Sequence, residues 1–220
     1  ALEQTPAAEK SQQPQAAQQP PKEKLARIWA NEPPLVRLAR DKFGAEFTET
    51  DAKFFAAVAA GEWADFRPSP ETKYDAESLA SWNDSVTLKA DRILWLCSEP
   101  SATRLVPSRG IWLRGVKIVD TLTFYRGTVP FSLTFFDCML DSGLNIRYAK
   151  VQEIDIYNCC SAKVDGFHAQ VTESVNLRKT TVYGGVNFVE AQIGGDLDMD
   201  GGLIFHSVLQ DDMAKPGVAI

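Results

Sequence analysis

Residues 144–204 repeat a short pattern in which an apolar or small residue, a polar residue and an apolar residue recur every five or six positions. An α-helix does not keep one face at that spacing, because its side chains return to the same side every three or four residues. A chain that turns a corner after each short strand does keep one, with the outer two residues of each triplet pointing inward. The clearest copies are Val175-Asn-Leu177, Thr180-Thr-Val182, Val186-Asn-Phe188, Ala191-Gln-Ile193 and Leu197-Asp-Met199.

The same signature extends backward along the chain and predicts a solenoid with four sides per coil. Bulky first members of the triplets alternate with smaller ones, so two sides are expected to be wide and two narrow. Four triplets with their turns make a coil of about 21 residues. The earlier inward pairs are Ile111/Leu113, Val116/Ile118, Leu122/Phe124, Leu133/Phe135, Cys138/Leu140, Leu144/Ile146, Ala149/Val151 and Ile154/Ile156.

This pattern resembles that of the pentapeptide-repeat family, in which a small residue, a polar residue and Leu or Phe precede two variable residues. The resemblance covers roughly residues 110–207 and includes Trp95-Leu-Cys97 before the repeat and Gly194-Gly-Asp-Leu-Asp198 late in it. It implies a mainly β protein, a right-handed, four-sided parallel β-helix preceded by an α-helical N-terminal region.

Two departures from the family pattern concern spacing and residue size. The spacing drifts from five to six, and Val often replaces the small residue, which predicts a wider or less square cross-section. Between Cys159 and Phe167 the register is lost, and we expect a bulge or kink there.

The chain is expected to divide into four parts. Residues 1–24 consist mainly of Gln, Ala and Pro, which bury too little surface to offset their ordering entropy, so they predict a flexible segment. A helical cap region at 25–106 and the parallel β-helix at 107–207 follow. Residues 208–220 form a tail or begin a further coil.

Two helices are expected in the first part of the cap region. Pro33-Pro34 can open the first, which ends at Gly44. Thr48 or Thr50 can cap the second, which ends at Gly61.

A third helix is predicted from Val86 to Cys97, with Ser85 or Thr87 as its cap and Pro100 beyond its end. An amphipathic helix just before a β-repeat can cover the unpaired backbone and the open apolar core of the first coil. We therefore interpret residues 25–106 as an N-terminal cap.

Composition and charge are those of an ordinary soluble globular protein. The chain has 220 residues, 45% hydrophobic content and a net charge of −6. Up to residue 106 there are 16 acidic and 13 basic residues, and after it 13 and 10, so each half carries −3. Such a charge does not indicate a nucleic-acid or membrane binder, and no stretch approaches the ~18 consecutive apolar residues of a membrane span. We expect no nucleic-acid partner and no transmembrane segment.

Asp196, Asp198 and Asp200 with Gly201 match the first half of a calcium-binding EF-hand loop. The twelfth position of that loop is Ser207, so the bidentate acid is missing. We interpret the three aspartates as a solvated strand face and expect no metal and no cofactor.

The two histidines, His168 and His206, are 38 residues apart and do not share a column of a coil of about 21 residues. No nucleophile elbow, P-loop or dinucleotide-binding glycine pattern accompanies them. We assign no catalytic residue and expect a protein that is not an enzyme.

Cys138 and Cys159 are one coil apart, and both take inward positions on a narrow side. Stacking would bring their Cα atoms to about 5 Å, which is within the disulfide range. A reduced pair is the default, because the core accepts small residues there, and a disulfide remains the alternative. Cys160 is expected to point outward as a free thiol.

These patterns favour a non-enzymatic β-helical scaffold that presents flat polar faces to a protein partner. The resemblance offers one alternative, a DNA-mimicking topoisomerase inhibitor. Such proteins rely on a strongly acidic, extended, dimeric helix, whereas this repeat region carries −3 and exposes Arg147, Arg178 and Lys179. A second alternative is an enzyme with a site between the cap and the first coils, which would lie near Asp65, Trp82, Asp84 and Arg109.

The two ends of the chain bear on location and assembly. Ala1 and the Gln/Ala/Pro-rich segment after it favour a periplasmic or secreted protein over a cytoplasmic one. The run 211–220 ends on an apolar triplet, as if another strand began there. Either the native protein continues, or the open C-terminal end of the solenoid is closed by its own tail or by another copy in a homo-oligomer.

The register can be tested at Phe188. If its side chain points inward, Phe188→Asp places a charge in the core and destabilises the protein by about 3 kcal/mol or more. Thermal melting measures the effect, and an unchanged melting temperature would contradict the register.

Overall fold

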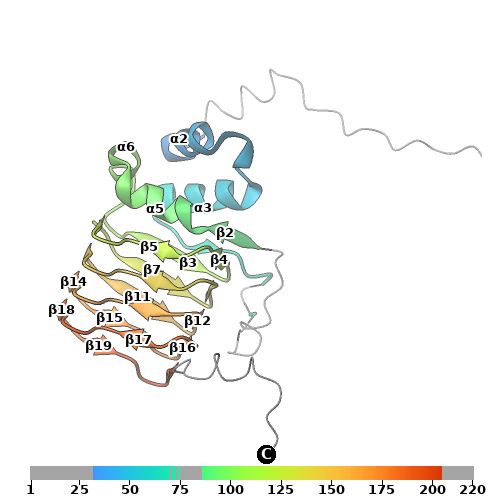
Figure 1. The fold of residues 1–220 in the computed structure, drawn as a ribbon. Coiled ribbons are helices and arrows are strands. Elements are labelled where there is room, and N and C mark those ends of the chain that lie inside the picture. Colours follow the sequence, from blue (N-terminus) through green and yellow to red (C-terminus); the bar gives the residue numbers. More distant parts are fainter. Residues whose placement is uncertain (1–31, 70, 73, 75–85, 205–220) are drawn as a thin grey trace, which may run out of the picture. The chain divides into compact units, whose positions relative to one another are not determined.

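The computed structural model describes residues 32–69, 71, 72, 74 and 86–204, and the elements below lie within residues 33–220. Helices lie at one end of a stack of short parallel strands (Figure 1). The described helices are α2 (Pro34–Phe43), the 3-10 helix η1 (Gly44–Glu46), α3 (Glu49–Ala60), α5 (Ala90–Ser98) and α6 (Pro100–Thr103).

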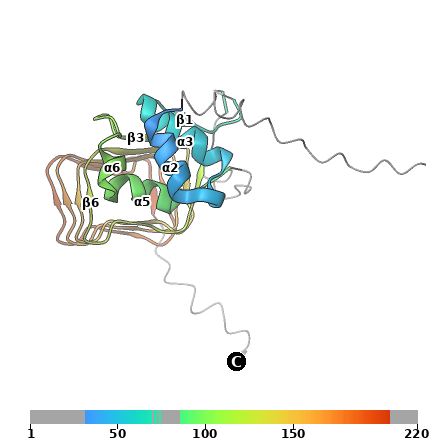
Figure 2. The same cartoon turned by 90° about the horizontal axis from the view of Figure 1, so that it is seen from above.

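The strands build a parallel β-solenoid of about four turns with about 22 residues per turn, which confirms the predicted fold class. Four parallel sheets make its four sides, and Figure 2 shows the coils superposed as a four-sided outline. Paired residues of successive coils in sheet A are 22, 21, 21 and 22 positions apart, close to the expected value of about 21.

Two of the sheets have six strands and two have four. Sheet A contains β1 (Ala64–Asp65), β3 (Ile111–Arg114), β7 (Leu133–Phe136), β11 (Ile154–Tyr157), β15 (Val175–Asn176) and β19 (Leu197–Asp198). Sheet B contains β2 (Thr87–Lys89), β4 (Lys117–Val119), β8 (Met139–Leu140), β12 (Cys160–Ser161), β16 (Thr181–Val182) and β20 (Leu203–Ile204). Sheet C contains β5 (Leu122–Thr123), β9 (Leu144–Asn145), β13 (Val164–Asp165) and β17 (Val186–Asn187). Sheet D contains β6 (Thr128–Val129), β10 (Lys150–Val151), β14 (Gln170–Val171) and β18 (Gln192–Ile193).

Pairing between coils stacks the inward side chains in columns. Ile111 pairs with Leu133, Leu133 with Ile154, and Ile154 with Val175. All four side chains are fully buried, and each contributes about 1.5–3 kcal/mol relative to an exposed position. The predicted alternation of inward and outward positions is confirmed along these strands, because fully buried residues alternate with partly exposed ones.

The first two helices begin and end as the sequence predicts. Pro34 is the first residue of α2, and Gly44 follows its last. Thr48 caps α3 in a capping box, because its hydroxyl accepts from the Asp51 backbone N–H at 3.1 Å and the Asp51 carboxylate accepts from the Thr48 N–H at 2.8 Å. Gly61 ends α3 in the left-handed conformation, with φ of 67°.

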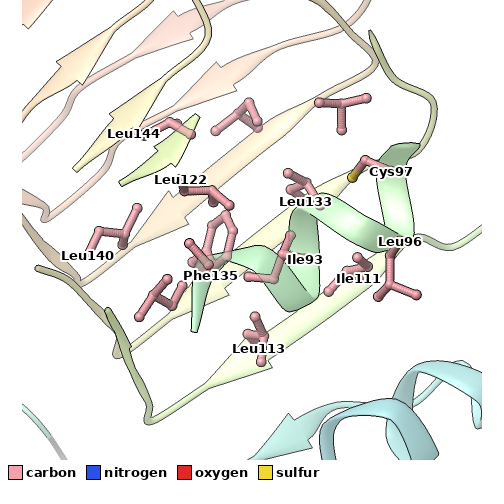
Figure 3. Close-up of a cluster of buried hydrophobic side chains, with 14 of the residues drawn as sticks. Ile93, Leu96, Cys97, Ile111, Leu113, Leu122, Leu133, Phe135, Leu140 and Leu144 are labelled. Carbon is pink, nitrogen blue, oxygen red and sulfur yellow. The ribbon is translucent and has the colours of Figure 1, made fainter. Parts of the chain in front are cut away.

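Helix α5 closes the open end of the solenoid core, as the cap interpretation predicts. Figure 3 shows Ile93, Leu96 and Cys97 of α5 beside the inward side chains Ile111 and Leu113 of the first complete coil. All five are buried. The apolar end of the coil is therefore covered by a helix and not by water.

A buried ion pair holds α5 against α3. Arg92 is 1% exposed, and its Nε donates to Asp51 Oδ1 at 3.0 Å. Its Nη2 donates to the Glu46 carbonyl at 2.9 Å, and its guanidinium lies 4.1 Å from the Phe43 ring. Trp95 packs edge-on against Phe43 at 5.6 Å between ring centroids and so contributes to the packing of α5 on α2.

The third predicted helix begins later than expected. Thr87–Lys89 is strand β2, which pairs in parallel with β4, and α5 begins only at Ala90. Lys89 is the N-cap residue and makes no side-chain cap hydrogen bond, so Thr87 is not the cap; Ser85 lies outside the described residues. The correction has a physical reason, because the free backbone edge of β4 is satisfied by a strand and not by a helix.

The cap region also supplies β1 to sheet A. Ala64 pairs with Leu113, and Asp65 pairs with Arg114. The solenoid thus begins with an incomplete coil formed by β1 and β2, far upstream of the expected start at residue 107. Sequence periodicity did not reveal it, because the two strands are isolated from each other and from the repeat.

The predicted bulge between Cys159 and Phe167 is wrong. Strand β12 pairs with β8 and β16, and β13 pairs with β9 and β17, so the ladders continue without a break. The pattern is interrupted because one turn is a residue shorter than the corresponding turn of another coil. Ala162 and Lys163 join β12 to β13, whereas three residues, 141–143, join β8 to β9. A missing turn residue shifts the spacing of the pattern but leaves every strand paired.

A second cause of the lost pattern is Gly166, which stands where other coils have a large inward residue. Phe124, Ile146 and Phe188 occupy the matching places in their coils. A Cβ atom on Gly166 would lie 2.3 Å from Cε1 of the Phe188 ring. The ring of one coil therefore fills the space that a missing side chain leaves in the coil before it.

Single left-handed residues turn three of the four corners, and at the corner between sheets B and C they are Asp120, Gly143 and Gly185. Asp137, Asn158 and Lys179 have φ of 50°, 51° and 54° at the corner between sheets A and B. At the corner between sheets C and D, positive φ occurs at Arg126, Tyr148, His168 and Glu190. This conformation costs an L-residue about 1–2 kcal/mol. Contacts between coils offset the cost, for example the Asn158 amide that donates to Asp137 Oδ1 at 2.6 Å.

The predicted stacking of Cys138 and Cys159 is confirmed, and both carry free thiols in the structure. The Cys138 N–H donates to Cys159 Sγ at 3.3 Å, and the Cys159 N–H donates to Thr180 Oγ1 at 3.4 Å. The small polar residues of this column therefore accept backbone donors from the preceding coil. Cys160 is a free thiol at an outward position, but it is 1% exposed and hydrogen-bonds with Tyr183, so it is not open to solvent.

The packing of Phe188 over Gly166 can be tested with a double-mutant cycle. We expect Gly166→Val to destabilise the protein by about 2 kcal/mol, because the new side chain overlaps the ring. In the Phe188→Ala background the same substitution should cost much less, because the ring is gone. Chemical denaturation measures both, and equal costs in the two backgrounds would contradict the contact.

Candidate functional site

One outer side of the solenoid gathers aromatic and arginine side chains. Outward positions of β3, β7 and β11 in sheet A carry most of them, and the segments before β1 and β3 and after β15 supply the rest. We call this surface the aromatic–arginine face, and it consists of Trp63, Arg109, Trp112, Arg114, Phe136, Tyr157 and Arg178.

A stacked column forms the centre of this face. The Arg114 guanidinium lies 4.2 Å from the Phe136 ring centroid. The Phe136 and Tyr157 rings stack at 4.8 Å with an interplanar angle of 19°, and Arg178 lies 5.7 Å from the Tyr157 centroid. Sheet pairing places these residues one above another, because Arg114 pairs with Phe136 and Phe136 with Tyr157. The backbone register therefore aligns the stack.

Two tryptophans extend the face towards the cap. The Trp63 and Trp112 rings are 4.9 Å apart, and the Arg109 guanidinium lies 3.4 Å from the Trp112 ring centroid. Trp63 is next to Ala64 of β1, so the pairing of β1 with β3 places it beside Trp112. Arg114 thereby lies near two rings, at 4.7 Å from Trp63 and 4.2 Å from Phe136.

Two open hollows of about 460 Å³ each flank the central column, and Arg114, Phe136 and Tyr157 line both of them. The first hollow lies over Thr134 and Asp155 and is bounded by Trp63, Trp112, Glu153 and Arg178. The second lies towards the corner with sheet B and is bounded by Arg67, Tyr74, Asp137, Asn158 and Lys179.

The carboxylates at the edge of this face are engaged with other side chains. Arg67 Nη2 donates to Asp65 Oδ2 at 2.7 Å. Burial alone would raise the pKa of Asp65, but the hydrogen bonds from Arg67 hold it below its usual value. Burial raises the pKa of Asp137, an effect that the hydrogen bond from Asn158 partly offsets.

Asp155 differs from these two because its Oδ1 atom is buried without a hydrogen-bond partner. Burial, followed by the neighbouring charge of Glu153, raises the pKa of Asp155. An unpaired buried carboxylate costs stability. Its position on the floor of the first hollow makes it a candidate contact for a ligand that donates a hydrogen bond.

The other sheets present different surfaces. The outward residues of sheet D are exposed and polar: Thr128, Lys150, Gln170 and Gln192. On sheet C the outward residues are Thr123, Asn145, Asp165 and Asn187. Asp165 is 4% exposed and is held by Arg147 at 3.2 Å and Lys163 at 3.0 Å, so its contacts serve the fold.

The three aspartates that resemble half a calcium loop make separate contacts. The Asp196 N–H donates to Ser174 Oγ at 3.0 Å, and the Asp200 N–H donates to Asp198 Oδ1 at 2.9 Å. Asp198 Oδ2 lies 3.6 Å from Arg178 Nε. Within the part of the chain that the structure describes, no group of three His, Cys, Asp or Glu side chains is placed to hold a metal ion.

His168 lies at the corner between sheets C and D, where its Nε2 is 3.0 Å from Glu190 Oε2 and its ring stacks on Tyr148 at 5.1 Å. His206, Trp82 and Asp84 lie outside the described residues. The structure therefore tests the suggested enzyme site only at Asp65 and Arg109, which are engaged with Arg67 and Trp112.

Two of the buried thiols, those of Cys97 and Cys159, lack the acidity of a reactive cysteine. Burial raises the pKa of Cys97 to about 12 and that of Cys159 well above its usual value. Neither is a nucleophile near neutral pH, because the thiolate is the reactive form.

The sequence contained a signal for this face that the triplet analysis did not use. The residue directly after each bulky triplet of sheet A is Arg114, Phe136, Tyr157 or Arg178. These positions recur once per coil. Trp63 had no such signal, because it lies outside the repeat and reaches the face only through the pairing of β1.

At the far end of the solenoid, large apolar side chains of the last described coil are exposed. Leu197, Met199, Leu203 and Ile204 are 40%, 38%, 56% and 39% exposed. The homo-oligomer suggested for this end remains a prediction, because residues 205–220 lie outside the described part. Among the described residues, no helix has the length and apolar character needed to span a bilayer.

Comparisons of the chain with protein-family models, curated proteins and solved structures gave no match. The fold is therefore established by the coordinates, and membership of the pentapeptide-repeat family remains a prediction.

The unpaired carboxylate predicts that Asp155→Asn stabilises the folded protein by an amount that depends on pH. Because the folded-state pKa of Asp155 is raised, its favourable contribution exists below the unfolded pKa and is lost as pH rises through the folded pKa. We expect the variant to be more stable than the natural protein by about 1 kcal/mol at pH 7. The gain shrinks as pH falls through the raised folded-state pKa and is lost below the unfolded value of about 3.9. Thermal melting from pH 3 to 8 measures this, with exposed Asp196→Asn as control, and a gain that does not depend on pH would contradict it.

Proposed function

We propose that this chain is a non-enzymatic β-solenoid interaction module that binds a protein partner through the aromatic–arginine face. The supporting observation is the gathering of two tryptophans, a phenylalanine, a tyrosine and three arginines on the outside of sheet A. Trp, Tyr and Arg are the residue types that contribute most of the binding energy at protein interfaces.

The partial exposure of the rings supports a role in binding as well as in folding. Trp63, Trp112, Phe136 and Tyr157 are each partly buried and partly exposed. A fully structural aromatic residue would be expected inside the coil, where Phe135 is fully buried next to Phe136. The outward rings bury apolar area only in part, and a partner surface can complete that burial.

The stacking of the face also lowers the entropic cost of binding. Phe136 is held between Arg114 and Tyr157, and Tyr157 between Phe136 and Arg178. Side chains already held in one arrangement lose little freedom when a partner docks. The rigid backbone ladder beneath them keeps the face flat over several coils.

The DNA-mimic alternative receives no support from this face, because a DNA mimic requires rows of acidic residues and the outward column here contains Arg114 and Arg178. The described residues near the suggested enzyme site, Asp65 and Arg109, are engaged in an ion pair and in ring stacking. We therefore place the binding function on the aromatic–arginine face.

Partner capture tests this proposal. We expect Trp112→Ala combined with Tyr157→Ala to reduce capture from extracts of the source organism at least tenfold, a loss of about 1.4 kcal/mol or more. Both side chains point outward, so the fold should persist, which circular dichroism can verify.

The matched control is Gln170→Ala combined with Gln192→Ala on sheet D, which also removes two outward side chains; these two lie in adjacent coils, whereas Trp112 and Tyr157 lie two coils apart. Its capture should equal that of the natural protein. Equal capture by the two double variants, or a greater loss in the sheet D variant, would contradict the placement of the interface.

A further inference from the structure

Arg114 is the residue of the aromatic–arginine face whose bonding capacity the protein leaves unused. Its guanidinium lies 4.7 Å from the Trp63 ring centroid and 4.2 Å from that of Phe136. The two rings are perpendicular to each other, at an interplanar angle of 83°, and contact the guanidinium on two adjacent sides. Its Nε atom is buried and has no hydrogen-bond partner. In the described part of the chain, its side chain forms neither a hydrogen bond nor an ion pair.

The carboxylates nearest to Arg114 in the sheet are directed elsewhere. Asp65 pairs with Arg114 along the backbone, but its carboxylate accepts from Arg67 Nε at 3.0 Å and Nη2 at 2.7 Å. Asp137 accepts from the Asn158 amide at 2.6 Å. The structure therefore places a cation beside two aromatic rings. Its charge acts to lower the pKa of Asp65 and of Asp137, but the hydrogen bonds of these carboxylates come from Arg67 and Asn158.

The unpaired guanidinium restricts the ligand that it can take. With rings on two adjacent sides, the terminal N–H groups that do not face a ring are the ones open to a ligand, and a planar fork of such donors matches a carboxylate. Ring edges are electropositive and also favour oxygen atoms of a ligand. An arginine that is partly withdrawn from water gains more from such a partner than an exposed one does.

We propose that Arg114 is the anchor for a carboxylate side chain of the protein partner. The proposal rests on the proposed function and adds the chemistry of the partner, an acidic residue that docks at the centre of the face. The hollows on both sides of Arg114 provide space for the chain that carries it.

Asp155 determines a second chemical feature of the partner segment. It lies two strands away from Arg114 in sheet A and two residues along the strand, because Asp155 pairs with Thr134 and Thr134 with Trp112, which corresponds to about 12 Å. Its unpaired Oδ1 accepts a hydrogen bond and repels a second acid. An extended peptide covers this distance in about four residues, and side chains four positions apart point to the same side. The partner segment therefore carries an acidic residue and, about four positions away, a donor such as lysine.

Nuclear magnetic resonance of the arginine side chains tests this contact in the intact chain. The probe is the peptide acetyl-Glu-Ala-Ala-Ala-Lys-amide, added to 15N-labelled protein, and the readout is the Arg114 Nε–H resonance, assigned through its disappearance in Arg114→Lys. We expect a saturable shift of this resonance. Replacing Glu by Gln in the peptide should weaken binding about tenfold, as expected for a lost charged hydrogen bond.

Arg126 is the matched internal control, because it is also stacked on rings, 5.2 Å from Tyr125 and 5.6 Å from Tyr148, but lies at the opposite corner. Its Nε–H resonance should not move. A peptide with Glu in place of Lys should bind more weakly than the original, because Asp155 repels it.

Three results would overturn the proposal: no Arg114 shift, equal binding of the Gln peptide, or an equal shift with inorganic phosphate, which would indicate a general anion site. Loss of partner capture in the Trp112/Tyr157 double variant together with no Arg114 shift would remove the carboxylate anchor and leave the interface in place. Retained capture with a clear Arg114 shift would leave Arg114 as a carboxylate site and remove the interface from this face.

Discussion

Backbone hydrogen bonding between coils is the constraint on which the rest of this structure depends. Each strand of the solenoid pairs with the strand one coil before and one coil after, so a residue is fixed above its counterpart. Because the pairing is parallel, side chains of the same position stack in columns. Inward columns make the core, for example Ile111, Leu133, Ile154 and Val175, and outward columns make the faces.

The stacking rule explains features that look irregular in the sequence. Gly166 interrupts a column of large residues, and the Phe188 ring fills the space it leaves. Thr180 and Cys159 are small and polar in an otherwise apolar core because each accepts a backbone N–H from the preceding coil. In both cases the residue departs from the repeat pattern because it fits the residues above and below it in its column.

The parts of the fold that could be predicted are those that depend on periodicity. Alternating triplets predict strands and inward positions, and Thr48, Gly44 and Gly61 predict helix ends through local backbone chemistry. The strands β1 and β2 could not be predicted, because each is a single short segment whose partner is distant along the chain. Left-handed corners at residues such as Tyr148 also escaped prediction, because that conformation usually indicates glycine.

The aromatic–arginine face could be predicted in part. Arg114, Phe136, Tyr157 and Arg178 recur once per coil, so their column follows from the repeat. The placement of Trp63 and the unused guanidinium of Arg114 require coordinates, because they depend on the pairing of β1 and on which acids bind Arg67 and Asn158. Outward positions of a solenoid are free of core packing, so their chemistry is where function can be expected.

The placement of the partner on sheet A can be tested without knowing the partner, by hydroxyl-radical footprinting in intact cells and on the purified protein. We expect Trp112, Phe136 and Tyr157 to be oxidised several-fold less in cells than in isolation. Tyr125 and Tyr148, which are 50% and 40% exposed at another corner, should be oxidised equally in both. Equal oxidation of the sheet A aromatics in the two settings, or protection confined to Tyr125 and Tyr148, would contradict a binding role for this face.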